Sequence, residues 1–341
     1  MDWCRKAVIP VAIDMRTFIL AENAKGNFVE VESYSPFTEH DHFDLTNFNP
    51  KDGNDLRYVR AVFRAMIDRG YRLPGSRIKF IKAYEASKLT GERDLVDLPV
   101  KRGLSSSAAI SVATAGALHV LANGFGEELK EIDFLKRMAD IAYTAERKIL
   151  QVNCGQMDQY ASGLGNVLYM DCSTEPARPT FLRPRIDLPL VIGDTGQTKD
   201  TPIILAWLGN RFTDREAQFI EGMNEIVKIV EEAKKELSRE DPSLEKIGEL
   251  MNLNQHYLKN YLKISGDCPV SPSKLDDLIE ASVNAGALGA KLSGSGGGGA
   301  MVALCKPEDI PRVVEAIRKA GGDAFVTGVA KEGLSLKAIT R

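Results

Sequence analysis

The sequence lacks the features of membrane-spanning, secreted and nucleic-acid-binding proteins. No segment approaches the roughly 18 consecutive apolar residues of a membrane span, and the N-terminus has neither the charged nor the apolar region of a signal peptide. The net charge of the 341 residues is only -3, which indicates neither a nucleic-acid-binding surface nor an acidic tail. These absences predict a soluble cytoplasmic protein without nucleic-acid or membrane partners.

Cysteine and histidine are too few and too scattered to indicate a zinc or redox centre. The five cysteines are odd in number and have no CxxC spacing, so reduced thiols are expected. They are Cys4, Cys154, Cys172, Cys268 and Cys305. Only His40 and His42 are close together among the histidines. Their alternating polar segment is more typical of a solvated loop or strand face than of a metal site.

What the chain does have is ordinary globular composition, with 44% hydrophobic and 27% charged residues. At roughly 100–200 residues per domain, the length allows about two domains. In the first third, short β-rich runs come before the long helices, which favours an α+β module over a regular βαβ series. Strands are expected at Ala7–Ile13, Phe18–Leu20, Val29–Val31 and Ile78–Ile81, and a helix within Asp55–Asp68.

A proline-rich passage from Pro176 to Pro189 marks a candidate domain junction. We therefore expect domains at 1–175 and 176–341. In the second domain, apolar spacing predicts two helices on either side of Asp241-Pro242. The expected elements after them are a helix (274–285), a glycine loop, a strand (300–304), a helix (310–320) and a strand (324–326).

Three consecutive serines, Ser105 to Ser107, follow Gly103-Leu104 and precede an alanine-rich helix predicted at Ala108–Leu121. A helix N-terminus presents unpaired N–H groups and partial positive charge, so glycine and serine there can bind phosphate. A simple N-cap is the alternative, but one cap does not need three serines. The segment is not a Walker A loop, because the chain has no G-x-x-x-x-G-K-[ST].

A glycine run, Gly294-Ser295-Gly296-Gly297-Gly298-Gly299, formally matches the dinucleotide-binding fingerprint. That fingerprint requires a strand before it and a helix after it. Here a helix is expected before the glycines and a strand after them, so the fingerprint fails. A loop whose backbone can closely approach a ligand or another loop remains, with a flexible connector as the alternative.

Two carboxylates, Glu146 and Asp158, lie between these loops. Beside a phosphate site, such a pair could supply a metal ligand and a base. Taken alone, the pair is weak evidence, since a surface glutamate and a turn aspartate are common.

Read together, the three motifs resemble the ordered motifs of the GHMP kinases, a superfamily that includes galactokinase, homoserine kinase and mevalonate kinase. They are Pro99 to Ala109, Ala145-Glu146 with Val152 to Gln159, and Gly289 to Gly299. The resemblance spans almost the whole chain. It implies a two-domain α+β fold, with an N-terminal domain like ribosomal protein S5 domain 2 and a ferredoxin-like C-terminal domain.

The resemblance also implies an ATP- and Mg²⁺-dependent mechanism. Asp158 would accept the proton of the attacking hydroxyl, and Ser107 and Glu146 would coordinate magnesium. Asp2, Asn153, Gly155 and Gln156 would bind the substrate. ATP would contact Gly103, Leu104, Ser105, Ser106, Ser107, Ala108, Gly294, Gly296 and Gly297. Because phosphoryl transfer is largely dissociative, positioning and charge neutralisation dominate.

The subfamily is ambiguous. The segment Ala145 to Gln159 resembles galactokinase-like sugar 1-kinases, whereas Gly193 to Gly196, Met251 to Asn254 and Gly289 to Gly299 resemble mevalonate kinase. Lys199-Asp200-Thr201 has a looser similarity to glucuronokinases. We expect a sugar kinase of carbohydrate metabolism, monomeric or homodimeric, that phosphorylates the anomeric hydroxyl. Neutral aldoses rank first, uronic acids second and mevalonate third, because the Asp2 carboxylate would repel that of mevalonate.

Two departures from the family pattern open further alternatives. The chain starts within the first galactokinase-like motif, so the first strand and its arginine are missing. Either the natural start lies upstream, or the protein is a non-catalytic sugar- and ATP-sensing regulator; Glu146 and Asp158 favour the former. The basic pairs Lys101-Arg102 and Arg5-Lys6 would hold triphosphate or an acidic sugar, unless they are solvated loop cations.

Overall fold

The computed structural model describes residues 1–33, 39–100, 102–197, 201–263 and 273–339. The chain forms two compact units, each assembled from three stretches of sequence. Unit 1 comprises Met1–Ile13, Lys101–Ser105 and Asn166–Ala330; unit 2 comprises Asp14–Val100, Ser106–Gly165 and Lys331–Arg341. This division differs from the expected one at residue 175. The first thirteen residues belong to unit 1 through bridges such as Val8 to Met170 and Val11 to Val167, which are long-range pairings that local sequence patterns do not show.

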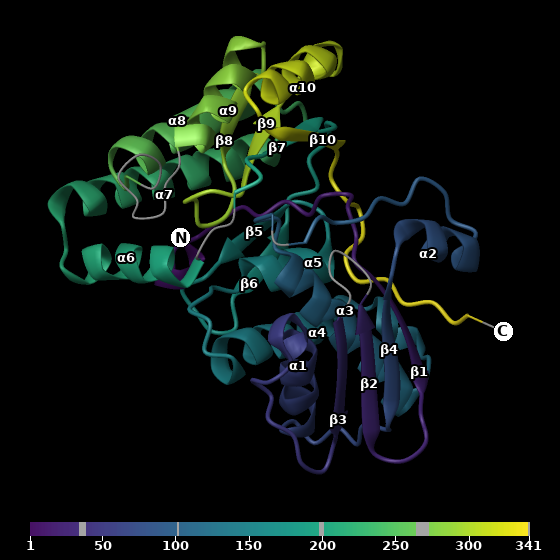
Figure 1. The fold of residues 1–341 in the computed structure, drawn as a ribbon. Helices are drawn as coiled ribbons and strands as arrows, with labels where there is room; N and C mark the ends of the chain where they lie inside the picture. Colours follow the sequence, from purple (N-terminus) through teal and green to yellow (C-terminus); the bar gives the residue numbers. More distant parts are fainter. Residues whose placement is uncertain (34–38, 101, 198–200, 264–272, 340–341) are drawn as a thin grey trace. The chain divides into compact units, whose positions relative to one another are not determined.

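A four-stranded mixed sheet forms one layer of unit 2. Its strands are β1 (Phe18–Asn23), β2 (Phe28–Ser33), β3 (Glu39–Asp44) and β4 (Ser76–Ile81), in the order β1-β4-β2-β3 (Figure 1). The pairs β1–β4 and β2–β3 are antiparallel, and β2 runs parallel to β4, with Val31 opposite Ile78. Val29, Val31 and Ile78 are fully buried, so one face of this sheet supports the core.

Helices cover that face of the unit 2 sheet. The helices of unit 2 are α1 (Arg57–Ile67), α2 (Ala83–Thr90), α3 (Ser106–Asn123), α4 (Ile132–Tyr143) and α5 (Met157–Leu164), with 3-10 turns η2 (Asn54–Leu56) and η3 (Glu127–Lys130) and a π-helical turn η4 (Thr144–Ile149). Phe63 and Met66 of α1, Leu118 of α3 and Phe134 and Met138 of α4 share one core with the strand residues. This packing fixes the position of α3, which begins with the serine motif.

Unit 1 is built around a second, entirely antiparallel sheet. Its strands are β7 (Leu190–Asp194), β8 (Gly289–Leu292), β9 (Ala300–Leu304) and β10 (Asp323–Thr327), in the order β10-β7-β9-β8. Helices separate β7 from β8 and β9 from β10 along the chain, which gives the β-α-β-β-α-β pattern of ferredoxin-like folds. The expectation of a ferredoxin-like fold is thus confirmed. A separate hairpin joins β5 (Leu168–Asp171) to β6 (Arg178–Phe181).

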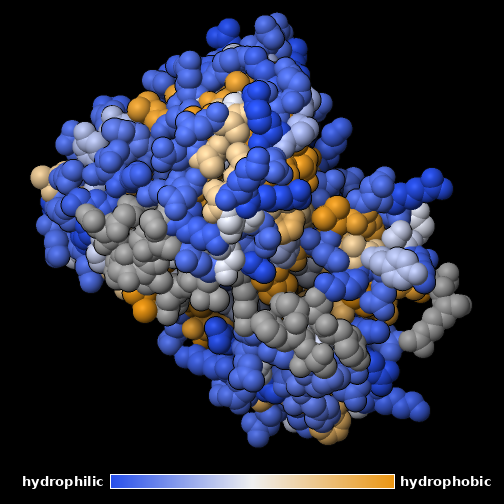
Figure 2. Space-filling view, turned by 45° about the horizontal axis from the view of Figure 1, so that its top comes forward, coloured by the Kyte–Doolittle hydropathy of each residue, from blue (hydrophilic) through white to orange (hydrophobic). Residues whose placement is uncertain are grey.

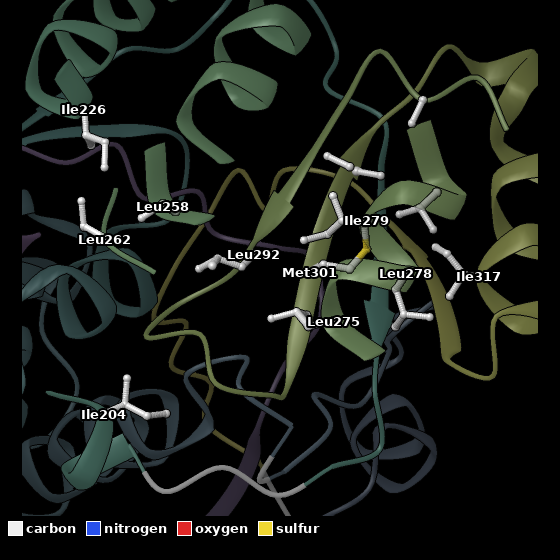
Figure 3. Packing of buried hydrophobic residues seen from close by; sticks show 14 of the residues in the cluster. Ile204, Ile226, Leu258, Leu262, Leu275, Leu278, Ile279, Leu292, Met301 and Ile317 are labelled. Atoms are coloured by element: carbon white, nitrogen blue, oxygen red, sulfur yellow. The ribbon is translucent and has the colours of Figure 1, made fainter. Parts of the chain in front are cut away.

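The helices of unit 1 are α6 (Thr201–Thr213), α7 (Ala217–Leu237), α8 (Leu244–Asn260), α9 (Ser273–Asn284) and α10 (Ile310–Lys319), with 3-10 turns η1 (Asp2–Cys4) and η5 (Pro307–Asp309). Their apolar faces meet the sheet in a second core. In Figure 3, Met301 of β9 lies beside Ile279 of α9, with Ile317 of α10 near Leu278. Met301 and Ala303 of β9 are buried in this core. Because β9 begins directly after Gly299, this packing fixes the C-terminal end of the glycine loop.

Three expectations about local structure need correction or refinement. Ala7–Ile13 is not a regular strand and forms only isolated bridges. The element directly before the glycine loop is strand β8, where a helix was expected. Gly289 and Ala290 are poor strand formers, so the local sequence does not indicate a strand. The His40–His42 segment is strand β3, and His42 stacks on Phe28 with ring centroids 5.1 Å apart.

Hydrophilic residues cover most of the face seen in Figure 2, with apolar residues in small patches. Within the described ranges, none of the helices is long and apolar enough to cross a membrane.

Candidate active site

Within the serine motif, the chain passes from the residues of unit 1 to those of unit 2. Gly103, Leu104 and Ser105 belong to unit 1, and α3 begins in unit 2 with Ser106. Gly103 and Ser105 have positive φ angles of 76° and 58°, a conformation that favours glycine and costs serine about 1 kcal/mol or more. Ser107 and the buried Ala108 lie in the first turn of α3. The free N–H groups of that turn make it suitable for binding phosphate.

Glu146 is the centre of a buried polar cluster in unit 2. It lies in the π-helical turn η4 with only 4% of its surface exposed. The Gln159 amide donates a hydrogen bond of 2.9 Å to its Oε1, and the Ser107 hydroxyl also hydrogen-bonds to the carboxylate. Burial, reinforced by the charge of Asp158, raises the Glu146 pKa to about 7 despite these two hydrogen bonds. None of the cationic side chains that the structure describes is among the causes of this shift.

This environment fits a divalent cation. A buried carboxylate without a compensating cation is costly, and Mg²⁺ typically takes one or two protein carboxylates together with hydroxyl, phosphate and water oxygens. The Oε1 atom of Gln159 is buried without a hydrogen-bond partner, which leaves an acceptor beside the cluster for a bound group. Among the described residues, no three His, Cys, Asp or Glu side chains form a metal cluster, but a magnesium site of this type does not need three.

Asp158 lies in the first turn of α5, where the helix dipole stabilises negative charge. Gln156 is the N-cap residue of the same helix and is buried. The preceding loop is tied back to η4, since Val152 donates a backbone hydrogen bond of 3.0 Å to the Glu146 carbonyl. The Arg147 guanidinium donates to the Asn153 side-chain oxygen. The structure thus brings Ser107, Glu146, Asp158 and Gln159 together, with Asn153 and Gln156 on the connecting loop.

In unit 1, the end of β7 connects the two predicted phosphate loops. The Thr195 backbone N–H and hydroxyl both donate to the Gly299 carbonyl, at 3.0 Å and 2.9 Å. Arg102, just before Gly103, donates to the buried Asp194 carboxylate at 2.7 Å. Gly294, Gly296 and Gly297 have φ angles of 71° to 73°, which explains why the loop needs glycine. One strand end therefore holds Gly299 of the glycine loop and the segment that leads into the serine loop.

Asp2 lies in the 3-10 turn η1 of unit 1 and is buried. The Trp3 backbone N–H donates to its carboxylate at 3.0 Å. The Arg102 side chain is paired with the buried Asp194 carboxylate at 2.7 Å and is 41% exposed, so it is not an unpaired loop cation. Arg5 is exposed, in agreement with a loop cation. Lys101, Lys199, Asp200 and Cys268 lie outside the described residues.

The site consists of two clusters: the group around Glu146 in unit 2, and the group at the end of β7 in unit 1. Several residues of these clusters were not predicted from the sequence. Gln159 and Tyr58 lie near Glu146, and the charge of Glu146, after burial, raises the Tyr58 pKa. Tyr58 could not be separated from the core residues of its amphipathic helix. Asp194 and Thr195 carried a weak signal, an apolar strand that ends in Gly-Asp-Thr-Gly. Their bonding partners are far away in sequence and could not be inferred.

Comparison with known proteins places these clusters in a family. The model of the GHMP kinase N-terminal domain matches residues 57–166, and that of the GHMP kinase C-terminal domain matches residues 223–323. A mevalonate kinase of Thermococcus sibiricus is 30% identical over 98% of this chain and 93% of its own length. The chain is a GHMP kinase. It is accordingly a phosphotransferase with an alcohol group as acceptor, and the fold and family expectations are confirmed.

Other relatives of this GHMP kinase include both mevalonate kinases and galactokinases. A mevalonate kinase of Pyrococcus horikoshii is 32% identical over 98% of the chain and 93% of the relative. A galactokinase of Pyrococcus furiosus is 27% identical over 93% of the chain and 88% of the relative. Among solved structures, a mevalonate kinase from Methanococcus jannaschii has a TM-score of 0.71 at 20% identity and covers 96% of this chain and 93% of its own. The mevalonate alternative is thus better supported than the sugar acceptor ranked first from sequence. The expected boundary at residue 175 lies between the two matched stretches and stays a prediction.

Proposed function

We propose that this GHMP kinase transfers the γ-phosphate of ATP to a hydroxyl of mevalonate or of a closely related hydroxy acid. The observation that carries this proposal is the similarity to mevalonate kinases along 98% of the chain, at 30–32% identity against 27% for the galactokinase.

The residues of the two clusters have properties suited to such a transfer. The first turn of α3 would bind the ATP phosphates through its free N–H groups. Ser107 and Glu146 would hold Mg²⁺, which supplies charge neutralisation at the phosphates. Asp158 would accept the proton of the attacking hydroxyl. Thr195 would keep the glycine loop in place through Gly299.

The electrostatic reason for ranking mevalonate last is weaker than the sequence indicated. The Asp2 carboxylate accepts a backbone hydrogen bond from Trp3 at 3.0 Å, so part of its charge is already compensated. Repulsion of a second carboxylate is correspondingly reduced. Asp2, Asn153, Gly155 and Gln156 remain proposed substrate-binding residues.

A neutral aldose is the second candidate acceptor. It is favoured by the galactokinase-like segment Val152 to Gln159 and by a solved galactokinase complexed with galactose, from Lactococcus lactis, which has a TM-score of 0.70 and covers 97% of this chain and 90% of its own. At 20% identity that structural likeness supports the fold and does not choose the acceptor.

A coupled ADP-release assay over mevalonate, galactose, arabinose and glucuronate tests the proposal. We expect kcat/KM for mevalonate to exceed that for every sugar. A higher kcat/KM for any sugar would overturn the mevalonate assignment and leave the kinase family unaffected. ADP release with none of these compounds would contradict both candidate acceptors.

A further inference from the structure

An open surface pocket with a volume of about 570 Å³, called the cavity below, lies in unit 2 at the C-terminal ends of α1 and α3. Its wall includes Arg69, Tyr71 and Arg72, which follow α1, together with His119 and Asn123 of α3 and Arg137 of α4. Asn123 is roughly 24 Å from Ser107 along the axis of α3, at 1.5 Å per residue. The cavity is therefore separate from the Glu146 cluster, which adjoins the opposite end of that helix.

Among the described residues, no carboxylate forms an ion pair with any of the three guanidinium groups. Arg69 donates to the Asp140 carbonyl at 3.3 Å and to the Thr144 hydroxyl at 3.0 Å. Arg137 lies over the Phe134 ring, 5.7 Å from its centroid. Arg72 makes neither a hydrogen bond nor an ion pair with any residue that the structure describes. A guanidinium presents five donors in a planar fork, so most donor positions around this cavity are available.

His119 adds a buried polar group to the cavity wall. The residue is 7% exposed, and its Nε2 atom is buried without a hydrogen-bond partner. Its other ring nitrogen lies 3.4 Å from the Tyr71 hydroxyl. The nearest acid is Glu128, with Oε1 3.9 Å from Nε2, beyond hydrogen-bond distance. Glu128 is thus close enough for an ion pair with a protonated His119 ring, and an acceptor on a bound molecule could complete the hydrogen bonding of this nitrogen.

The local charge balance favours an anion. The C-terminal ends of α1 and α3 each contribute a partial charge of about -0.5. Together with Glu128, they offset about two of the three arginine charges. The remaining positive charge lies beside a cavity within the usual size range of small-molecule sites, about 300–1,000 Å³.

We propose that this cavity binds a small molecule through a phosphate or diphosphate group, held by Arg69, Arg72 and Arg137. Phosphate oxygens match the guanidinium fork in bidentate geometry, which neutral ligands cannot do. The ligand would bind independently of ATP at the serine loop, because the two places are at opposite ends of α3. This inference does not depend on which alcohol the kinase phosphorylates.

Calorimetric titration with inorganic pyrophosphate, at saturating non-hydrolysable ATP analogue and Mg²⁺, tests the proposal. The nucleotide prevents pyrophosphate from binding at the serine loop. We expect binding with one-to-one stoichiometry. The single variants Arg72→Gln and Arg137→Gln should each weaken it about tenfold, the loss expected when one charge-assisted hydrogen bond is removed. Arg64→Gln is the matched control, since Arg64 lies on α1, outside the cavity, and pairs with Asp68.

Three results would overturn the proposal: no pyrophosphate binding to the nucleotide-saturated protein when the ATP analogue itself binds in a single equivalent, equal affinity of the wild type and both cavity variants, or equal weakening by Arg64→Gln. Titration with the ATP analogue alone distinguishes the possible sources of the phosphate group. Two equivalents bound would show that the cavity accepts a nucleotide, and one would show that it selects a different phosphorylated molecule.

His119 gives a second, site-specific measurement. Burial, and then the charge of Arg137, lowers its pKa, while Glu128 opposes that shift. A bound anion should raise the pKa and shift the ring resonances of His119 in an NMR titration with pyrophosphate. His40, His42 and His256 are internal controls and should not change. A His119 resonance that does not respond while pyrophosphate binds would place the ligand elsewhere.

Discussion

Burial of Glu146 disfavours the charged form of its carboxylate, and a bound divalent cation would offset this penalty. Its pKa is raised from 4.5 to about 7, so the metal-free folded protein holds a proton that the unfolded chain releases between these values. The stabilising contribution of this group is complete below pH 4.5 and is lost as the pH rises through 7. At pH 8, ionised Glu146 lowers the free energy of unfolding of the metal-free protein by an amount on the order of 3 kcal/mol.

Glu146→Gln should therefore stabilise the metal-free protein at pH 8 and have little effect at pH 4.5. Thermal unfolding at the two pH values measures this difference. Added Mg²⁺ and ATP should stabilise the wild type at pH 8 more than the variant, because the variant has lost a metal ligand. Glu127→Gln, at an exposed position, is the control and should show no such pH dependence. Equal stabilisation of the wild type and Glu146→Gln by Mg²⁺ and ATP would contradict the metal role.

Asp158→Asn tests the proposed base. Its amide cannot accept the proton, so kcat should fall by about 100-fold or more, the usual contribution of a general base. The KM values should change little, because the interaction is made chiefly in the transition state. Steady-state kinetics, with circular dichroism as a check on folding, measure both quantities. Asp133→Asn is the control, at an exposed position in α4. A folded variant that keeps its kcat would contradict the role as base, and a variant that unfolds would indicate a structural role for Asp158.

Among the elements, β7 determines the position of the glycine loop through Thr195. Thr195→Val removes the hydroxyl that donates to Gly299 at 2.9 Å and accepts from the Gln197 N–H at 3.2 Å. We expect a loss of about 1 kcal/mol in stability and a higher KM for ATP. Thr213→Val is matched to it, because that hydroxyl also donates to a glycine carbonyl, Gly209, at 2.9 Å. An equal KM for ATP in both variants would remove the loop from the nucleotide site.

Helix α8 protects the edge of the unit 1 sheet. The Asn252 side chain donates to the Leu288 carbonyl at 3.1 Å and accepts from the Ala290 N–H at 2.9 Å, and Gln255 accepts from the Leu292 N–H at 3.0 Å. The helix approaches so closely that a Cβ on Gly289 would lie 2.1 Å from the Gly248 carbonyl oxygen. These side chains satisfy backbone groups that an edge strand leaves unpaired.

Asn252→Ala should cost about 2 kcal/mol, since two hydrogen bonds to the edge strand are lost. Chemical denaturation measures the cost, and the m-value should not change. Asn260→Ala at the end of the same helix is the control, because the described hydrogen bond of its side chain is to the exposed His256 and not to the sheet. A loss equal to that of the control would show that α8 is held by apolar packing alone.

For the whole molecule, sequence patterns predicted what depends on neighbouring residues. The amphipathic spacing of α1, α7 and α8, and the helix that starts at the serine motif, were all recoverable. The three ordered motifs identified the family. The membership of residues 1–13 in unit 1 and the Thr195–Gly299 contact depend on long-range pairing, and no local periodicity encodes it. The pairing of Arg102 with Asp194 was hidden for the same reason.

The acceptor was ranked from one short segment, Ala145 to Gln159, and one charge, Asp2. The galactokinase-like residues of that segment surround Glu146 and Asp158, the proposed metal ligand and base. Because sugar and mevalonate kinases would share these two roles, the segment does not distinguish between the acceptors. Similarity over the whole chain includes more of the residues that would determine which acceptor fits the site. For this reason, we give it more weight than the segment.

A competition assay tests the central claim most directly. The protein is incubated with Mg-ATP and equal concentrations of mevalonate and galactose, and the products are identified by mass spectrometry. We predict that phosphorylated mevalonate is the dominant product and that Asp158→Asn forms little of it. Dominant galactose phosphate, or phosphorylation of neither compound by the folded wild-type protein, would contradict the proposed function.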